Sequence, residues 1–263
     1  MGRFNLLDEP WIPVLVETNG DTKNVSLIDL FENAHNYIGL ACDTKTQEFA
    51  ILRILLAITN TVFSRFDATG EVYDSVEIDD KYRQLCSVSE DDSEEYSENL
   101  LDTWESLWEL GRYPRIIMIY LEKWRDRFYL FDDQYPFFRV LENEVSEEFL
   151  NKKNPSSISG KNINRIISES GNKVALFSPK SQHKNNKEIL SAEEVARWII
   201  TFQGYTGLSD KVIFGNEKYK ASKGWLFDLG GVYLEGDNVF ETLLLNMIMI
   251  DDYDYYLNVQ KPS

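Results

Sequence analysis

The chain has 263 residues, 43% of them hydrophobic, and a formal net charge of −17 at pH 7. This length and composition are enough to bury a core and exclude an intrinsically disordered chain. The negative charge argues against a protein that simply coats nucleic acid.

No apolar run approaches the roughly 20 residues that span a bilayer, and the N-terminus lacks the apolar region of a secretory signal. We therefore expect no membrane partner. Cys42 and Cys86 lie far apart, and we predict that both are reduced and buried. A cytoplasmic, reducing location is consistent with this use of cysteine.

The charge is unevenly distributed along the chain. Residues 67–109 hold 15 acidic and 2 basic side chains, a net charge of −13. Residues 151–223 hold 6 acidic and 13 basic side chains, a net charge of +7. We expect binding to follow the local charge rather than the total.

The chain opens on an extended apolar segment, Phe4–Val14. Pro10 and Pro13 fix the backbone φ and disfavour a helix here. We predict a turn before Pro10 and a strand from Trp11 to Val16, held in a core by Trp11. Asn19-Gly20 then predicts a hairpin turn into a second short strand at 23–27.

Capping residues mark the next two helices. Ser26 or Asp29 begins a short helix through Ala34. Thr44, with Gln47 three residues later, forms a capping box at the start of a long apolar helix that reaches Phe63.

Two further helices are predicted around the acidic stretch. The first, Asn99–Leu110, ends at Gly111 and carries on one face Leu100, Trp104, Leu107 and Trp108. The second is predicted as one continuous helix, Arg115–Phe131, and a turn follows at 132–138.

The region after residue 150 is predicted to be rich in loops. Residues 151–172 contain several breakers, 174–177 form a short strand, and 178–188 contain no apolar residue and form an exposed loop.

Ser191 and Glu194 then form a capping box that begins a helix. Its predicted apolar face consists of Val195, Trp198, Ile199 and Phe202, and Gly204 and Gly207 break it. After a loop at 211–223 we predict strands at Trp225–Leu229 and Val232–Glu235 and a helix at Phe240–Ile250.

No residue pattern in the sequence indicates catalysis. His35 and His183 have no neighbour at metal-ligand spacing, and no G-x-S-x-G, P-loop or G-x-G-x-x-G motif is present. A triad assembled from distant residues is not excluded by sequence order. We predict a protein that is not an enzyme and that binds no metal and no cofactor.

The basic segment is the most site-like feature. Its exposed loop carries Lys180, Gln182, His183 and Lys184, which suit phosphate contacts and hydrogen bonds to groove edges. A second exposed element holds Gly207, where the backbone could approach a groove closely, together with Ser209, Lys211, Lys220 and Lys223. A solvated, lysine-bearing surface without a ligand is the alternative for both elements.

Several motifs resemble one family. NLLDEPWIPV at 5–14 is similar to the N-terminal motif of the CasA family, the large subunit of the type I-E CRISPR Cascade complex. Further similar segments follow in the family's order: QYPFF at 134–138, VALFS at 174–178, ITFQGYTG at 200–207 and LLLN at 243–246.

The resemblance implies a non-catalytic subunit of an RNA-guided surveillance complex. Its expected partners are the CRISPR guide RNA, target double-stranded DNA, the other Cascade subunits and a recruited helicase–nuclease. Phe177 and the loop after it would lie near the 5′ end of the guide RNA. Gly207, Ser209 and Lys211 would lie at the DNA minor groove and help to recognise the motif beside the target, the PAM, as in other RNA-guided effectors.

Two departures from the family matter. The family's glycine run is reduced here to Gly207-Leu208-Ser209-Asp210. Family members are also about twice this length, and Gln260-Lys261-Pro262 resembles a motif from the middle of the family's sequence, so we expect a fragment, a split subunit or a truncated protein.

The expected fold class is α+β, with helices, short antiparallel strands and a single domain over residues 1–263 that lacks the family's C-terminal helical bundle. The alternative function is an acidic interaction protein or DNA mimic that binds basic partners through residues 67–109.

Overall fold

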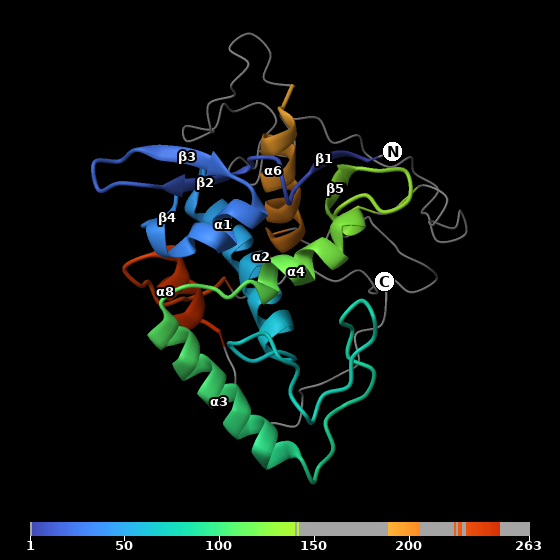
Figure 1. The fold of residues 1–263 in the computed structure, drawn as a ribbon. Coiled ribbons are helices and arrows are strands. Elements are labelled where there is room, and N and C mark those ends of the chain that lie inside the picture. The colour runs from blue at the N-terminus through green and yellow to red at the C-terminus, as the bar shows by residue number, and fades with distance from the viewer. Residues whose placement is uncertain are drawn as a thin grey trace. The chain divides into compact units, whose positions relative to one another are not determined.

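A computed structural model describes residues 2–139, 141, 189–205, 224, 226–227 and 230–247. The chain forms two compact units (Figure 1). Unit 1 comprises Met1–Ile12, Cys42–Ile51 and Asp126–Val232, and unit 2 comprises Pro13–Ala41, Leu52–Arg125 and Tyr233–Ser263. Helices and short antiparallel strands confirm the α+β class. The single domain over 1–263 stays a prediction.

Within the described residues, no helix is both long and apolar enough to cross a bilayer. The predicted strand 174–177, the loops 178–188 and 211–223, and residues 248–250 lie outside the described part of the chain.

Unit 1 contains a two-stranded antiparallel sheet. β1 (Arg3–Asn5) pairs with β5 (Tyr129–Phe131), with Asn5 opposite Tyr129. The unit also holds α6 (Ala192–Tyr205) and the first residues of α2 (Lys45–Phe63). Its core contains the two largest fully buried side chains of the described residues, Trp11 and Trp198.

Unit 2 begins with the predicted hairpin. β2 (Ile12–Leu15) lies between β3 (Thr22–Val25) and β4 (Gly39–Leu40) in a three-stranded sheet. In the turn, Val16 N donates to Asp21 O at 2.9 Å and Gly20 takes a φ of +95°, which glycine adopts without strain. The hairpin prediction is confirmed.

The predicted caps of the next two helices are confirmed as well. Ser26 Oγ accepts from Asp29 N at 3.1 Å at the start of α1 (Leu27–Asn33), which leads into the 3₁₀ turn η1 (Ala34–Asn36). Thr44 Oγ1 accepts from Gln47 N at 3.1 Å at the start of α2.

An aromatic cluster around Tyr113 forms the centre of unit 2. Its ring centroid lies 5.6 Å from that of Phe31, 6.1 Å from that of Phe63 and 4.9 Å from that of Phe240. These rings come from α1, α2 and α8 (Val239–Leu245), so one buried tyrosine joins three helices. Burial raises the pKa of the Tyr113 hydroxyl.

α3 (Ser93–Leu110) begins six residues before the predicted start at Asn99. The charged first turn favours the helix, because Glu94 and Glu95 lie at its positive N-terminal end. Tyr96 is also buried, and its hydroxyl donates to Ser64 O at 2.8 Å. The predicted end is confirmed, because Gly111 adopts a φ of +65°.

The predicted apolar face of α3 is only partly right. Leu100 and Leu107 are buried, but Trp108 is 42% exposed. The buried face includes Thr103 instead, whose hydroxyl accepts from Tyr73 Oη at 2.7 Å. A polar residue with a buried partner therefore takes the place that the sequence pattern gave to a tryptophan.

The single helix predicted at Arg115–Phe131 is wrong. The chain forms α4 (Ile116–Lys123), the 3₁₀ turn η2 (Arg125–Phe128) and then β5. Pairing with β1 overrides helical spacing here, and Leu6 N donates to Phe128 O at 2.9 Å. The turn at 132–138 is confirmed, because Asp132 Oδ1 accepts two backbone hydrogen bonds at 2.8 Å, and these lower the pKa of Asp132.

The strands predicted in 225–235 are wrong wherever the structure describes them. Leu226 and Phe227 are helical, and 232–235 belong to no strand. The Asn246 side chain instead bonds both backbone groups of Leu234, at 2.9 and 2.7 Å. The predicted helix begins as α8 at Val239 and is described as far as Leu245.

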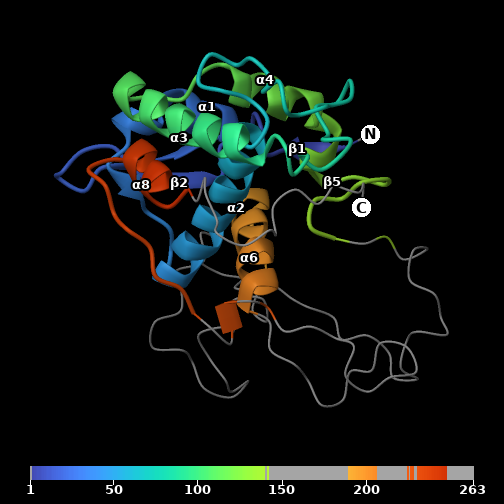
Figure 2. The same cartoon turned by 90° about the horizontal axis from the view of Figure 1, so that it is seen from below.

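α8 lies beside α3 in both Figure 1 and Figure 2. The indole Nε1 of Trp104 donates to Leu244 O at 3.0 Å, which fixes this contact.

The cysteine prediction is right for redox state and wrong for the burial of one thiol. Both cysteines are free, Cys42 is half-buried, and Cys86 is exposed in a loop. Burial raises the pKa of the Cys42 thiol, and nearby Arg197 partly opposes that shift.

Candidate nucleic-acid interface

The ten residues predicted to contact nucleic acid all lie outside the described residues. They are Phe177, Lys180, Gln182, His183, Lys184, Gly207, Ser209, Lys211, Lys220 and Lys223. α6 is described, and it connects the two segments in the sequence: residues 178–188 precede it and residues 206–223 follow it. What can be built from the described residues is therefore the way in which α6 is held in unit 1.

A capping box fixes the first turn of α6. Ser191 N and Oγ donate to Glu194 Oε2 at 2.8 and 3.0 Å, and Val195 N donates to Ser191 O at 3.0 Å. The Glu194 side chain is thus used by the helix start, although the residue is only 4% exposed. The predicted capping box is confirmed, and the helix start is defined to a single residue.

Arg197 joins α6 to the N-terminal segment. It is 3% exposed, and its Nη1 donates to Trp11 O at 2.9 Å. Its Nη2 lies 3.9 Å from Asp43 Oδ2. Burial raises the pKa of Asp43, and the Arg197 charge opposes that shift. A buried guanidinium requires such partners, so its position ties α6 to residue 11.

The N-terminal segment is itself held by hydrogen bonds within unit 1. Trp11 is fully buried, and its Nε1 donates to Leu6 O at 3.0 Å. Asn5 Oδ1 accepts from Leu7 N at 2.9 Å, and Asn5 O accepts from Asp8 N and Glu9 N. The turn predicted before Pro10 is therefore confirmed, and the carbonyl that receives Arg197 belongs to an ordered segment.

The last turn of α6 approaches its neighbour closely. A Cβ on Gly204 would lie 3.1 Å from Leu226 Cδ1, which is tighter than ordinary packing. Gln203 Nε2 donates to Phe138 O at 3.4 Å. The predicted break at Gly204 is wrong, because the helix continues to Tyr205. The glycine permits close packing here and does not end the helix.

Sequence reasoning missed the buried polar side of α6. The predicted face placed Val195, Ile199 and Phe202 inward, but these are only half-buried. Glu194, Arg197 and Thr201 are buried together with Trp198. Their spacing of three and four residues was the signal, because it puts all of them on one side of a helix.

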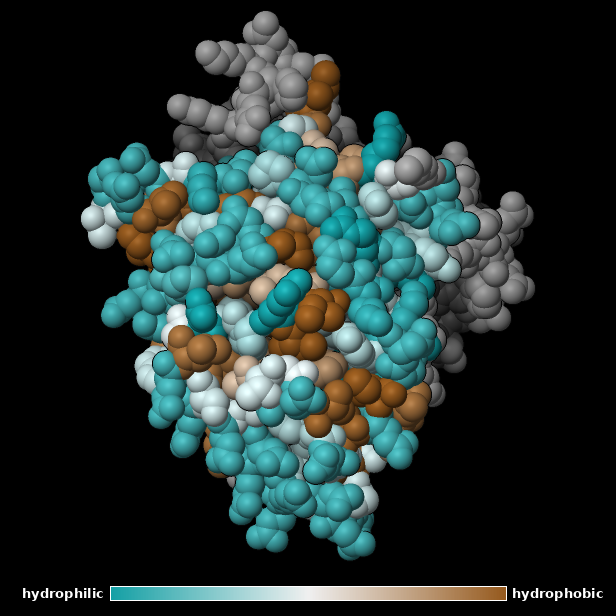
Figure 3. Space-filling view, in the orientation of Figure 1, coloured by the Kyte–Doolittle hydropathy of each residue, from teal (hydrophilic) through white to brown (hydrophobic). Residues whose placement is uncertain are grey.

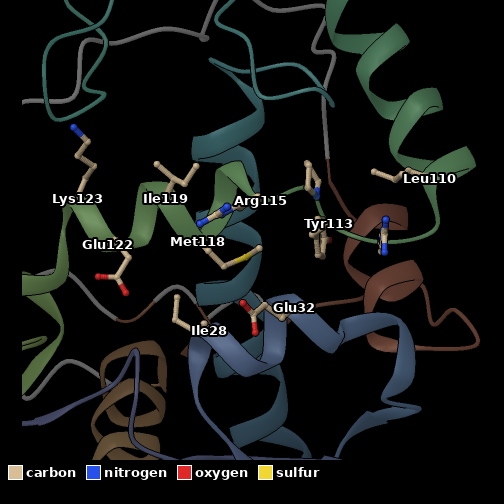
Figure 4. A pocket seen from close by; sticks show the side chains of 11 residues that line it. Ile28, Glu32, Leu110, Tyr113, Arg115, Met118, Ile119, Glu122 and Lys123 are labelled. Carbon is tan, nitrogen blue, oxygen red and sulfur yellow. The ribbon is translucent and has the colours of Figure 1, made fainter.

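Unit 2 contains a hollow of about 940 Å³ beside α1 and α4 (Figure 4). Ile28, Met118 and Ile119 give it an apolar lining, and charged side chains of both signs surround them: Glu32, Arg112, Arg115, Glu122 and Lys123. Glu122 is already paired with Arg125 at 2.5 Å. This lining offers neither a nucleophile nor a histidine, so it suits binding better than catalysis.

Metal chemistry has no support in the described part of the chain. No group of three or more His, Cys, Asp or Glu side chains is placed there to hold a metal ion.

Solved structures with this fold define the class of protein. A crystal structure of Thermobifida fusca Cse1 has a TM-score of 0.59 and 25% identity, over 94% of this chain and 39% of that chain. A chain of a "CRISPR RNA-guided surveillance complex" has a TM-score of 0.58 over 94% of this chain and 44% of its own. Its identity is 17%, so that likeness concerns the fold alone.

The chain belongs to the family described as CRISPR-associated protein Cse1, whose profile matches residues 5–262. The CasA/Cse1 protein of Thermus thermophilus is 27% identical over 252 residues. These cover 94% of this chain and 40% of that relative, so the chain spans about two fifths of its length. The family resemblance seen in the sequence motifs is confirmed.

Proposed function

We propose that the chain acts as a non-catalytic subunit of a CRISPR RNA-guided surveillance complex in antiviral defence. The observation that carries this proposal is the match of residues 5–262 to the Cse1 family. The fold shared with a chain of a surveillance complex supports it.

Within such a complex, the proposed contacts lie on the two segments that flank α6. Phe177, Lys180, Gln182, His183 and Lys184 contact the 5′ end of the guide RNA. Gly207, Ser209 and Lys211 contact the PAM of target double-stranded DNA, and Lys220 and Lys223 contact phosphates. The anchoring of α6 by Arg197 and Trp11 supports this assignment, because it gives both segments a rigid base.

Recruitment of a helicase–nuclease completes the proposed function, because a subunit without catalysis needs a partner to cut the DNA. Co-expression with the other Cascade subunits and a guide RNA tests the assembly. We expect the tagged chain to co-purify with the guide RNA and the other subunits. Recovery of the chain alone, from cells in which the other subunits assemble on the guide RNA, would contradict the proposal.

The phosphate contacts are tested by Lys180→Ala/Lys184→Ala/Lys211→Ala in the assembled complex. The slope of log affinity for target DNA against log salt should fall by about 0.9 for each lost DNA contact. The matched control is Lys23→Ala/Lys45→Ala/Lys123→Ala, which removes the same charge from unit-2 and α2 positions and should leave the slope unchanged. Equal slopes for all three proteins would contradict the contacts while leaving the subunit assignment intact.

Binding of basic proteins without nucleic acid is the second candidate function. The net charge of −13 over residues 67–109 favours it. Co-purification with basic proteins but no guide RNA would support this candidate over the first.

A further inference from the structure

One stripe of α3 combines acidic and large apolar side chains, all of them exposed. Glu94, Glu98, Leu101, Glu105 and Trp108 follow one another at spacings of three and four residues, so they lie along one side of the helix. We call these five residues the α3 stripe. Leu101 is 46% exposed and Trp108 is 42% exposed. Figure 3 shows mostly hydrophilic surface where Figure 1 places α3.

The tryptophan of the stripe is held in place from behind. Trp104 is fixed by its hydrogen bond to Leu244 O at 3.0 Å. Trp108 stacks on it, with ring centroids 5.4 Å apart and an interplanar angle of 11°. One side of the Trp108 ring is therefore occupied while a large part of its surface remains exposed. A preset, exposed tryptophan is the kind of side chain that dominates protein interfaces.

The carboxylates of α3 have no cationic partner among the described residues. The helix contains no Lys or Arg, and the ion pairs of the described chain lie elsewhere, as between Arg83 and Asp79 at 2.6 Å. Its six exposed acidic residues are Glu94, Glu95, Glu98, Asp102, Glu105 and Glu109. Like charges four residues apart destabilise a helix, so α3 carries a charge pattern that its own fold does not require.

We propose that the α3 stripe is a docking surface for a basic protein segment whose Lys or Arg side chains alternate with apolar ones. The charge fixes the sign of the partner: unpaired carboxylates attract cationic side chains and repel nucleic acid. Trp108 offers a ring surface to a guanidinium or ammonium group, and Leu101 offers an apolar contact. This inference goes beyond the proposed function and does not depend on nucleic-acid binding.

The test uses the whole chain and a fluorescein-labelled helical peptide in which Arg and Leu alternate at spacings of three and four residues. A second peptide replaces each Arg by citrulline, which keeps the shape and removes the charge. Fluorescence anisotropy at about 0.15 M salt, where surface charges are screened beyond roughly 8 Å, gives each Kd. We expect the arginine peptide to bind at least about tenfold more tightly than the citrulline peptide.

Two variants separate the stripe from the general negative charge. Glu94→Gln/Glu98→Gln/Glu105→Gln should weaken arginine-peptide binding about tenfold, because three exposed charge pairs are lost. Glu17→Gln/Glu71→Gln/Asp74→Asn makes the same change of charge elsewhere on unit 2 and should weaken binding less than about twofold. Equal losses in the two variants would mean non-specific attraction and would overturn the proposal.

The tryptophan is tested by Trp108→Ala against Leu85→Ala, since Leu85 is also exposed, at 53%. We expect about a fivefold loss of affinity for the first and no change for the second. Unchanged binding by Trp108→Ala, with a wild-type circular dichroism spectrum, would contradict the role of the stripe.

A second copy of the chain is the competing occupant. Sedimentation velocity decides this: if the wild type self-associates and the Glu94→Gln/Glu98→Gln/Glu105→Gln variant does not, then the stripe binds another copy and the proposal of a different basic protein is wrong.

Discussion

α6 and α3 are both long amphipathic helices with two acidic residues in the first turn, but they bury opposite kinds of side chain. α6 buries charge: Glu194 and Arg197 are 4% and 3% exposed. α3 exposes apolar groups, Leu101 and Trp108. In α6 each buried charge has a partner inside unit 1, as Arg197 has in Trp11 O and Asp43. In α3 the exposed groups have no such partner among the described residues.

The difference shows two uses of a residue that breaks the hydrophobic pattern. A buried guanidinium costs several kcal/mol unless its hydrogen bonds are made, so it specifies one position for α6. An exposed tryptophan costs little stability but adds apolar area to the surface, where a partner can cover it. The first use concerns the fold and the second concerns recognition.

The largest effect is expected from the two tryptophans themselves. Trp11→Ala should lower the free energy of unfolding by about 3–5 kcal/mol, because it removes a fully buried indole. Trp108→Ala should lower it by less than about 1 kcal/mol. Urea unfolding followed by circular dichroism measures both. Similar losses would contradict the assignment of Trp108 to an exposed surface.

The anchor of α6 should come next in size. Arg197→Ala should cost about 3 kcal/mol, because it leaves Trp11 O without its donor inside the core. Arg53→Ala, at an exposed position, is the matched change and should stay within about 0.5 kcal/mol. If Arg197→Ala proves as mild as Arg53→Ala in the same urea series, the anchor does not hold α6.

The acidic stripe should be mildly unfavourable to the fold. Glu94→Gln/Glu98→Gln/Glu105→Gln should raise the free energy of unfolding by about 0.5–1 kcal/mol, because it relieves like-charge pairs at spacings of three and four residues. The gain should disappear at about 1 M salt, where the screening length is near 3 Å. Thermal unfolding at both salt concentrations measures it. A loss of stability would mean that the carboxylates have structural partners.

The smallest effect concerns pH. The pKa of Asp43 is raised, mainly by burial, with Arg197 opposing. A carboxyl group whose folded pKa lies above its unfolded value of 3.8 contributes stability at low pH that is lost as the pH rises through the folded pKa. Asp43→Asn should therefore reduce the loss of stability above pH 3.8. An unchanged pH profile of unfolding would contradict this shift.

Local chemistry was readable from the sequence. The hairpin at Asn19-Gly20, the caps at Ser26, Thr44 and Ser191, and the helix end at Gly111 each depend on a few adjacent residues. Short-range hydrogen bonds decide these features, so propensity and spacing are sufficient to predict them.

Features set by distant partners were not readable in the same way. Residues 125–131 leave the helical pattern because β5 pairs with β1, more than 120 positions earlier in the chain. Trp108 lies outward because Thr103 has a buried partner in Tyr73. Arg197 is buried because Trp11 O, 186 positions away, accepts from it. Of the candidate site, the sequence indicated the flanking segments, and the structure supplied their anchor.

The most direct test of this account compares both kinds of ligand in one set of proteins. The wild type, Lys180→Ala/Lys184→Ala/Lys211→Ala and Glu94→Gln/Glu98→Gln/Glu105→Gln are each assembled with guide RNA and the other subunits, and the affinities for target DNA and for the arginine peptide are measured. We predict that the lysine variant weakens only DNA binding and the glutamate variant weakens only peptide binding. If either variant weakens both ligands, the separation of a nucleic-acid surface beside α6 from a protein surface on α3 is wrong.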